Sequence, residues 1–162
     1  MRGPLTSLEC NQPADSGPHG RRIMTSILED VPESHRDLLQ APLTATLTTV
    51  DSHGRPQSTA VWFLVDDDGQ LKSSVTSDRQ KFKNLERNPN CDLFIIDPVN
   101  PYRTLEVRAE AQLEADPDKA SVRKFARAYG VDEEMLLHAG EDRHVVVYRP
   151  RRIVVNPPAP AS

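Results

Sequence analysis

Short stretches in which polar and apolar residues alternate run along most of the chain, and this period of two predicts a mainly β fold. Apolar residues alternate with threonines between residues 43 and 50, where threonine favours a pleated, half-buried surface. Residues 92–96 include an uninterrupted apolar run, which is typical of a buried strand. The expected strands are residues 43–50, 56–65, 71–76, 92–96 and 103–113, followed by a last strand or pair of strands at residues 143–148 and 152–155, broken at Pro150.

A few segments carry the apolar spacing of a helix instead. Residues 27–39 are expected to form an N-terminal helix with Pro32 near its start, and a second helix is expected from Asp116-Pro117 to Gly130. A short helix is expected at residues 133–138. About six strands at short spacing, with helices inserted late, predict a six-stranded closed or split β-barrel of the α+β type rather than a βαβ layer.

Residues 75–89, with the sequence VTSDRQKFKNLERNP, predict a strand that runs into a short helix. Ser77 and Gln80 have the spacing of a capping box, so the helix is expected to begin here with its free N–H groups at the end of the strand. Arg79 and Lys81 are unfavourable at the positive end of a helix dipole unless an anion binds, which makes this turn a candidate phosphate site. The alternative is a capped surface helix that carries solvated charges.

The two ends of the chain differ in composition from the rest. Residues 1–22 hold three of the seven glycines and three prolines with little apolar periodicity, so they cannot bury enough surface to offset the cost of ordering. We expect disordered tails at residues 1–23 and 157–162 around one domain at residues 24–156. The first residues lack the apolar region of a secretory signal, and no apolar run approaches the roughly 20 residues of a membrane span, so we expect a cytoplasmic protein without membrane contact.

Charge and motif content argue against several classes of protein. The net charge of -4 and a pI near 5.7 argue against nucleic-acid binding. Cys10 and Cys91 do not resemble a disulfide framework or a metal set, and Cys91 is expected to be a small core residue. The acidic turn at residues 66–68 is expected to be solvated. The chain has no Gly-x-Ser-x-Gly, His-Glu-x-x-His, Cys-x-x-Cys or Walker motif, so we expect no hydrolase and no metal site, and no catalytic residue is identified.

Three segments of the chain follow one another in a recognisable order. They are residues 45–57 (ATLTTVDSHGRPQ), 71–76 (LKSSVT) and 79–89 (RQKFKNLERNP). Their succession resembles the pyridoxamine 5'-phosphate oxidase-like split β-barrel family of flavin and deazaflavin oxidoreductases. In that family the strand-to-helix junction holds the phosphate of FMN or, in one branch, of coenzyme F420. The resemblance also implies a homodimer whose cofactor site lies at the subunit interface.

The resemblance assigns a cofactor site to these segments. Gln57, Thr59 and Val61 share one face of a strand and are implied to hold a flavin-like ring, whereas without the resemblance Gln57 and Thr59 are read as facing solvent. Residues 74–76 are implied to flank the ring and the ribityl chain, and the start of the helix to hold the phosphate. The implied cofactor-binding residues are Arg55, Gln57, Thr59, Val61, Ser74, Val75, Thr76, Arg79, Gln80, Lys81 and Arg103.

Four cations are assigned more specific contacts. Coenzyme F420 continues past its phosphate into a lactyl-glutamate tail with several carboxylates, and Arg55, Lys83 and Arg87 are candidates to meet that tail. Each of these three side chains could equally be a solvated surface charge. Arg103, at the start of the long strand, matches a position where some relatives place a polar side chain near the ring.

The resemblance also narrows the function. The C-terminal arginine and tryptophan of the enzymes that oxidise pyridoxamine phosphate are missing, because this chain ends in Pro-Pro-Ala-Pro-Ala-Ser, which argues against vitamin B6 oxidation. The short form with Arg-x-Lys after the third strand looks like the deazaflavin branch. The expected protein is a coenzyme F420-dependent oxidoreductase that delivers hydride to a small conjugated or electron-poor molecule. The alternatives are an FMN-binding oxidoreductase of the same fold and a cofactor carrier without a dedicated substrate.

Overall fold

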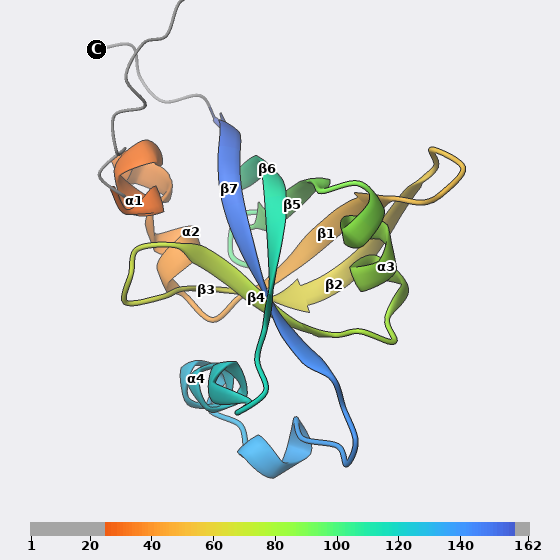
Figure 1. Ribbon diagram of the computed structural model, residues 1–162. Coiled ribbons are helices and arrows are strands. Elements are labelled where there is room, and N and C mark those ends of the chain that lie inside the picture. Colours follow the sequence, from red (N-terminus) through yellow and green to blue (C-terminus); the bar gives the residue numbers. More distant parts are fainter. Residues whose placement is uncertain (1–24, 158–162) are drawn as a thin grey trace, which may run out of the picture.

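The computed structural model describes residues 25–157, in which seven strands form one antiparallel sheet (Figure 1). The predicted tails lie outside the described residues, apart from Pro157. The sheet order is β2-β1-β5-β6-β7-β4-β3, so two strands that are consecutive in the sequence lie at opposite edges and the sheet curls into a split barrel. The prediction of a mainly β split barrel is confirmed, with one strand more than expected. The strands are β1 (Thr44–Val50), β2 (Pro56–Trp62), β3 (Leu64–Val65), β4 (Leu71–Thr76), β5 (Asn90–Ile96), β6 (Thr104–Ala115) and β7 (Arg143–Asn156).

The extra strand arises because the predicted strand at residues 56–65 breaks at Phe63, which is buried. The Phe63 N–H donates to the Tyr129 hydroxyl at 3.0 Å, and that hydroxyl lies 2.8 Å from the Phe63 carbonyl and 2.7 Å from the Leu43 carbonyl. Buried backbone groups need hydrogen-bond partners, and a residue between two sheet edges has no ladder partner. One tyrosine hydroxyl therefore supplies the contacts that let the chain cross from one edge to the other.

The two longest strands, β6 and β7, pair along the middle of the sheet. The predicted interruption at Pro150 is wrong, because β7 runs without a break from Arg143 to Asn156. Pro150 opposes Ala109 while Arg152 opposes Arg108, which leaves Arg151 as the extra residue of a β-bulge. The bulge beside the proline lets one long strand bend with the barrel although the proline has no N–H to donate.

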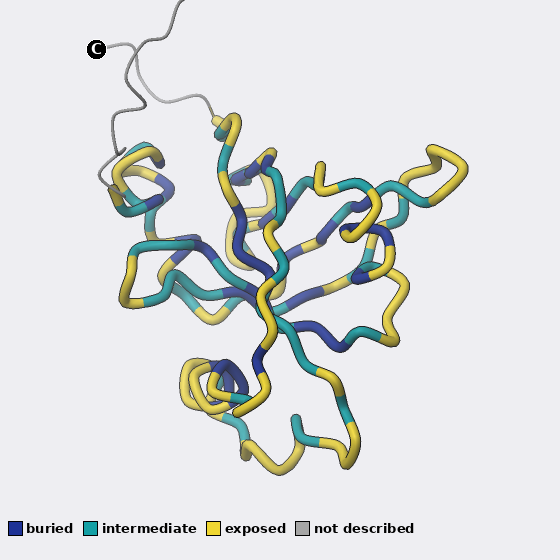
Figure 2. Tube along the Cα trace, in the orientation of Figure 1, coloured by how far each residue is buried: buried dark blue, intermediate teal, exposed yellow. Residues whose placement is uncertain are grey.

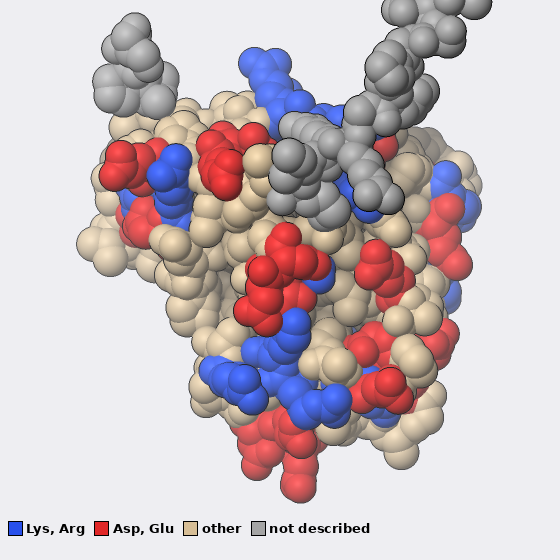
Figure 3. All heavy atoms as spheres, turned by 60° about the vertical axis from the view of Figure 1, so that its left-hand side comes forward, with Lys and Arg blue, Asp and Glu red and all other residues tan. Residues whose placement is uncertain are grey.

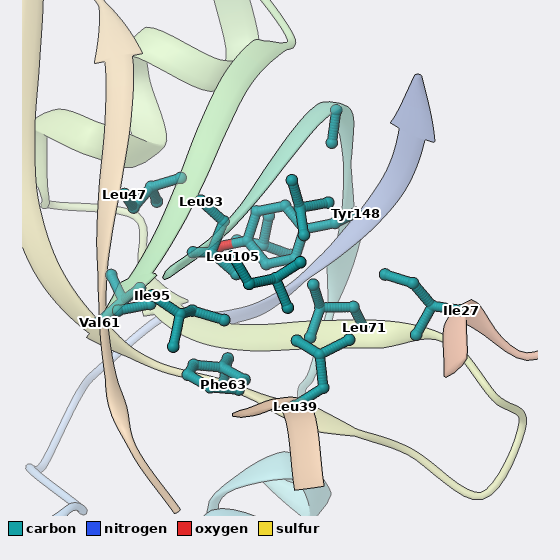
Figure 4. Packing of buried hydrophobic residues seen from close by; sticks show 14 of the residues in the cluster. Ile27, Leu39, Leu47, Val61, Phe63, Leu71, Leu93, Ile95, Leu105 and Tyr148 are labelled. Atoms are coloured by element: carbon teal, nitrogen blue, oxygen red, sulfur yellow. The ribbon is translucent and has the colours of Figure 1, made fainter. Parts of the chain in front are cut away.

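The core lies inside the curl of the sheet, as the predicted alternation requires. Leu47, Leu93 and Leu105 point inward from β1, β5 and β6 into one cluster with Tyr148 from β7, and Figure 4 shows Leu93 and Leu105 beside the Tyr148 ring. Buried and exposed residues alternate along these strands (Figure 2). Cys91 packs against this core, where burial raises the pKa of its thiol to about 12. Cys91 is therefore an inert packing residue, as predicted.

The helices lie outside the barrel, with α3 beside the β1–β2 hairpin and α4 at the far end (Figure 1). The helix predicted at residues 27–39 is broken, because the residue before Pro32 is forced into an extended conformation and a 3-10 turn follows. A 3-10 turn, Glu133–Met135, also stands where a helix was predicted at residues 133–138. In the described part of the chain, no helix has the length and apolar character to cross a bilayer. The helices are α1 (Ile27–Asp30), α2 (Asp37–Gln40), α3 (Gln80–Arg87) and α4 (Ala120–Tyr129), the last ending at Gly130 as predicted.

The crossing at Phe63 predicts a specific sensitivity to loss of one oxygen atom. Tyr129→Phe removes the hydroxyl and leaves buried backbone groups without partners, so the free energy of unfolding should fall by about 1–3 kcal/mol. Chemical denaturation measures it. Tyr102→Phe is the matched control, because Tyr102 is 83% exposed and loss of its hydroxyl should change stability little. Equal stability of the two variants would contradict the role given to Tyr129.

Candidate functional site

A cavity of about 440 Å³ opens on the outer side of the sheet, where β2, β4, α3 and α4 meet. Its sheet wall comes from Thr44, Ala60, Trp62 and Ser74, which lie on the outer face because their neighbours along each strand point into the barrel. The cavity therefore lies between the barrel and the two helices that pack on it. The lining residues are Thr44, Ala60, Val61, Trp62, Ser74, Lys81, Val122, Phe125, Leu136 and Arg143.

Most of the cavity wall is apolar and part of it is aromatic. The rings of Trp62 and Tyr129 stack with centroids 4.3 Å apart and planes inclined by 9°, and Phe125 lies beside them with its centroid 6.3 Å from that of Tyr129. Val122 and Leu136 complete this side. Flat aromatic and aliphatic walls with a few polar groups are the usual surroundings of a planar organic ring.

Lys81 provides a cation at the edge of the cavity. Its ammonium donates to the Ala60 carbonyl at 3.4 Å, and among residues 25–157 it has no carboxylate within 4.0 Å. Burial, with a smaller contribution from the neighbouring Arg79, lowers the pKa of Lys81 below its usual range. A half-buried ammonium without a counter-ion is stabilised by an anion, because an opposite charge offsets the loss of hydration.

The first turn of α3 lies next to this cation. The capping box predicted for Ser77 and Gln80 is not formed: the helix begins one turn later than Ser77, with Arg79 at the N-cap position and no side-chain cap. The Gln80 amide donates to Asn84 at 2.9 Å instead. Since no acidic residue occupies the first turn either, the positive end of the helix adds to the charge of Lys81.

A buried asparagine fixes α3 to the barrel. Asn84 is fully buried, and its side-chain N–H groups donate to Thr49 at 3.0 Å and to Gln57 at 2.9 Å. Its oxygen accepts from Gln80 and from Arg87 at 3.0 Å. Every hydrogen-bonding capacity of this amide is therefore used, and the helix that carries Lys81 is held against the β1–β2 hairpin.

The structure brings together only some of the residues assigned to the site. Val61, Ser74 and Lys81 line the cavity. Gln57 belongs to the Asn84 contacts, and Thr59 has a buried hydroxyl without a partner in the described part of the chain. Both are partly buried on the same side of β2 as Val61, but unlike Val61 neither lines the cavity. The assigned residues that do not line it are Arg55, Gln57, Thr59, Val75, Thr76, Arg79, Gln80 and Arg103.

Two of the assigned arginines are held elsewhere by carboxylates. The Arg103 guanidinium bonds to Asp97 at 2.8 Å and to Asp37 at 3.0 Å, which fixes it at the start of β6, away from the cavity lining. Arg55 pairs with Asp51 at 3.0 Å in the turn between β1 and β2. Their charges are therefore already balanced within this chain, unlike that of Lys81.

Sequence reasoning missed several residues of the site. Trp62 lies on the face of β2 opposite to the one that was assigned to the ring, and Phe125 lies in the helix predicted to end at Gly130, which was given no part in the site. Arg143 had no sequence signal. It donates to Ser74 at 3.2 Å, to the Leu136 carbonyl at 2.8 Å and to Glu141 at 2.6 Å. These contacts make Arg143 a rigid part of the wall.

Asp66 is another departure from expectation, since it is not simply solvated. It accepts from Lys72 at 2.9 Å and from Lys124 at 2.5 Å. Although burial opposes the shift, the bonds from these two lysines lower the pKa of Asp66 to about 2. The turn between β3 and β4 is thereby tied to α4, which forms one wall of the cavity.

Charge elsewhere on the molecule is mixed. The face in Figure 3 carries acidic and basic side chains close together, and the chain as a whole has a net charge of -4. Within residues 25–157, no group of three or more His, Cys, Asp or Glu side chains is placed to hold a metal ion. Attraction for an anion is therefore a local property of the cavity edge.

Comparisons with known proteins agree with this geometry. The chain matches the family model described as pyridoxamine 5'-phosphate oxidase over residues 31–155. A search of curated proteins gives no match. A solved structure named F420 reductase is 36% identical, with a TM-score of 0.68 over 76% of this chain and 98% of its own.

Two more distant structures share the fold. A putative pyridoxamine 5'-phosphate oxidase from Listeria innocua is 22% identical, with a TM-score of 0.52 over 80% of this chain and 92% of its own. The heme storage protein HutZ from Vibrio cholerae is 20% identical, with a TM-score of 0.61 over 75% of this chain and 92% of its own. The family match, which begins directly after α1 and includes all of β1 to β6 and most of β7, shows that the chain belongs to the pyridoxamine 5'-phosphate oxidase family of split β-barrel proteins.

Proposed function

We propose that the protein is a coenzyme F420-dependent oxidoreductase that delivers hydride to a small conjugated or electron-poor organic molecule. The observation that carries the proposal is the cavity itself, in which aromatic walls end at the Lys81 ammonium, a cation without a carboxylate partner among the described residues. The 36% identity to a structure named F420 reductase supports the choice of cofactor.

The residues present fit the two ends of such a cofactor. Lys81 and the uncapped first turn of α3, with Arg79 beside them, are suited to its phosphate. Trp62, Val122 and Phe125 are suited to the faces of its ring. When bound, the reduced deazaflavin supplies the hydride, while the protein orients the ring and excludes water. FMN has a similar ring and one phosphate, so it remains the alternative cofactor.

Two further cations support a cofactor with an anionic tail. Lys83 and Arg87 are exposed on α3, and no carboxylate of the described residues lies within 4.0 Å of either. Arg55, the third candidate for the tail, already has Asp51 as its partner. Carboxylates of the tail would therefore gain most from the α3 cations.

A homodimer is part of the same proposal, with the outer face of β5 and β6 as its contact. Phe94 and Ile96 lie on this face, and Ile96 is 46% exposed. Asp92 lies on the same face of β5 and has a buried carboxylate oxygen with no partner among the described residues, and burial together with Glu106 raises its pKa to about 6. Arg152 of β7 lies in the same row of cross-strand neighbours as Asp92. A twofold axis would set this mixed patch against itself, so Asp92 of one copy could meet a basic residue of the other.

The dimer is tested by sedimentation at micromolar concentration. The wild-type protein should sediment as a dimer, and Phe94→Glu should shift it to monomer because two charges would be buried at the axis. Val99→Glu is the control, since Val99 is 90% exposed in a turn and should leave the dimer intact. A wild-type monomer that still binds cofactor would refute this contact.

Removal of the cavity cation should weaken cofactor binding. Lys81→Ala should raise the dissociation constant by about 10- to 100-fold, because one charge-assisted contact to phosphate contributes roughly 1.5–3 kcal/mol. Thermal stability should not fall, since the unpaired ammonium is costly to bury. Arg79→Ala should behave alike, whereas Arg127→Ala, an exposed cation of α4, should bind normally. Unchanged affinity in calorimetry for both Lys81→Ala and Arg79→Ala would place the anion site elsewhere.

The choice between cofactors is tested by titrating both at two salt concentrations. Coenzyme F420 should bind at least about tenfold tighter than FMN, and the preference should shrink as salt rises because contacts to exposed cations are screened. Fluorescence reports both affinities. Tighter binding of FMN would favour the FMN oxidoreductase. Tight binding of F420 without reduction of any electron-poor test compound would favour a carrier.

A further inference from the structure

Ser74 is one member of a chain of hydrogen-bonded side chains behind the cavity wall. Its hydroxyl oxygen lies 3.2 Å from that of Ser121, and the Ser121 hydroxyl donates to Asp116 at 2.5 Å. On the other side, Arg143 donates to the Ser74 oxygen at 3.2 Å. Asp116 and Ser121 are both buried, so this end of the chain is closed to water, whereas Ser74 and Arg143 line the cavity.

The direction of each hydrogen in this chain is fixed from its buried end. Asp116 accepts three hydrogen bonds: from the N–H of Ala120 at 2.9 Å, from the N–H of Ser121 at 3.1 Å and from the Ser121 hydroxyl. As an acceptor at the start of α4 it is also favoured by the helix dipole. A serine hydroxyl has one hydrogen, and Ser121 gives it to Asp116. Ser121 can therefore only accept from Ser74.

The consequence for Ser74 is that its own hydrogen is used up. The hydroxyl donates to Ser121, and one of the two lone pairs of its oxygen accepts from Arg143. Arg143 is held in place by Glu141 and by the Leu136 carbonyl. What Ser74 can still offer to a molecule in the cavity is one lone pair, and no hydrogen.

We propose that Ser74 is a specificity-determining residue that recognises an N–H donor on the bound ring, and that the cavity therefore selects planar rings with an imide or lactam N–H. This inference rests on the proposed function for the identity of its ligand, since the rings of coenzyme F420 and FMN both carry an imide N–H. A ring whose edge presents only acceptors or carbon, such as the periphery of a heme, would leave the Ser74 lone pair unpaired in a dry wall. The Asp116–Ser121 pair acts as the positioning element, because it holds the hydrogen of Ser74 away from the cavity.

The test measures how strongly each protein distinguishes FMN from FMN methylated at the imide nitrogen. Fluorescence titration gives both dissociation constants. The ratio of the dissociation constant of methylated FMN to that of FMN is then compared between wild type and variants, as in a double-mutant cycle. Ser74→Ala should reduce the ratio by about three- to tenfold, the effect of one neutral hydrogen bond. Ser74→Cys should also reduce it, because sulfur is a weak acceptor but fills at least as much space, so extra room for the methyl group is not the cause.

Two further variants separate recognition from a general effect on the fold. Ser121→Ala keeps the Ser74 oxygen but frees its hydrogen to turn towards the cavity, so the ratio should fall below the wild-type value. Ser58→Ala is the matched control. Ser58 lies on β2 and bonds to Thr48 at 2.8 Å outside the cavity lining, so its loss should keep the wild-type ratio. Melting temperatures verify that all four variants are folded.

The inference is overturned if Ser74→Ala and Ser74→Cys retain the wild-type ratio, or if neither form of FMN binds at all. If Ser121→Ala has the wild-type ratio, the positioning role given to Asp116 and Ser121 is wrong. These outcomes are distinct from failure of the proposed function, because the comparison uses FMN throughout. If the protein binds FMN more tightly than coenzyme F420, and both Ser74 variants distinguish the two forms of FMN less well than wild type, the inference about Ser74 holds and only the proposed cofactor changes.

Discussion

The barrel depends on a crossing made by one residue. Between β2 and β3 the chain passes from one edge of the sheet to the other at Phe63, and a backbone in that position has no strand to pair with. The Tyr129 hydroxyl takes over this pairing, and its ring stacks on Trp62, the residue just before the crossing. Closure of the sheet and formation of the cavity wall are thus two results of the same side chain.

The sequence was sufficient for the sheet because its signal is local. Alternation along β1 and β6 sets which side chains point inward, and burial follows that alternation. The break at Phe63 could not be predicted in the same way, because its partner, Tyr129, lies 66 residues further along the chain. The continuous course of β7 through Pro150 depends likewise on a bulge, whose position is set by pairing with β6. Local patterns therefore predicted the elements, whereas contacts between distant residues decided where they begin and end.

The distinction between local patterns and contacts of distant residues also applies to the candidate site. Lys81 was identified because a cation in the first turn of a helix is electrostatically unfavourable without an anion, and the structure leaves it without a carboxylate among residues 25–157. Of the three residues predicted to hold the ring, Val61 lines the cavity, whereas the Gln57 side chain accepts a hydrogen bond from the buried amide of Asn84. The Arg103 side chain is likewise hydrogen-bonded to Asp37 and Asp97. A polar residue in a plausible position is available to a ligand only if no nearer partner satisfies it.

The position of β4 in the sheet determines when the cavity wall can form during synthesis of the chain. β4 pairs only with β3 and β7 among the described strands, and β7 is the last of them in the sequence. During synthesis, Ser74 therefore leaves the ribosome long before Ser121 and Arg143, which hold it in the finished wall. Contacts of such long sequence separation form late, after the hairpin of β1 and β2 can already exist. The cavity is consequently a property of the complete barrel, and a nascent chain cannot capture a cofactor in it before the final strand has been added.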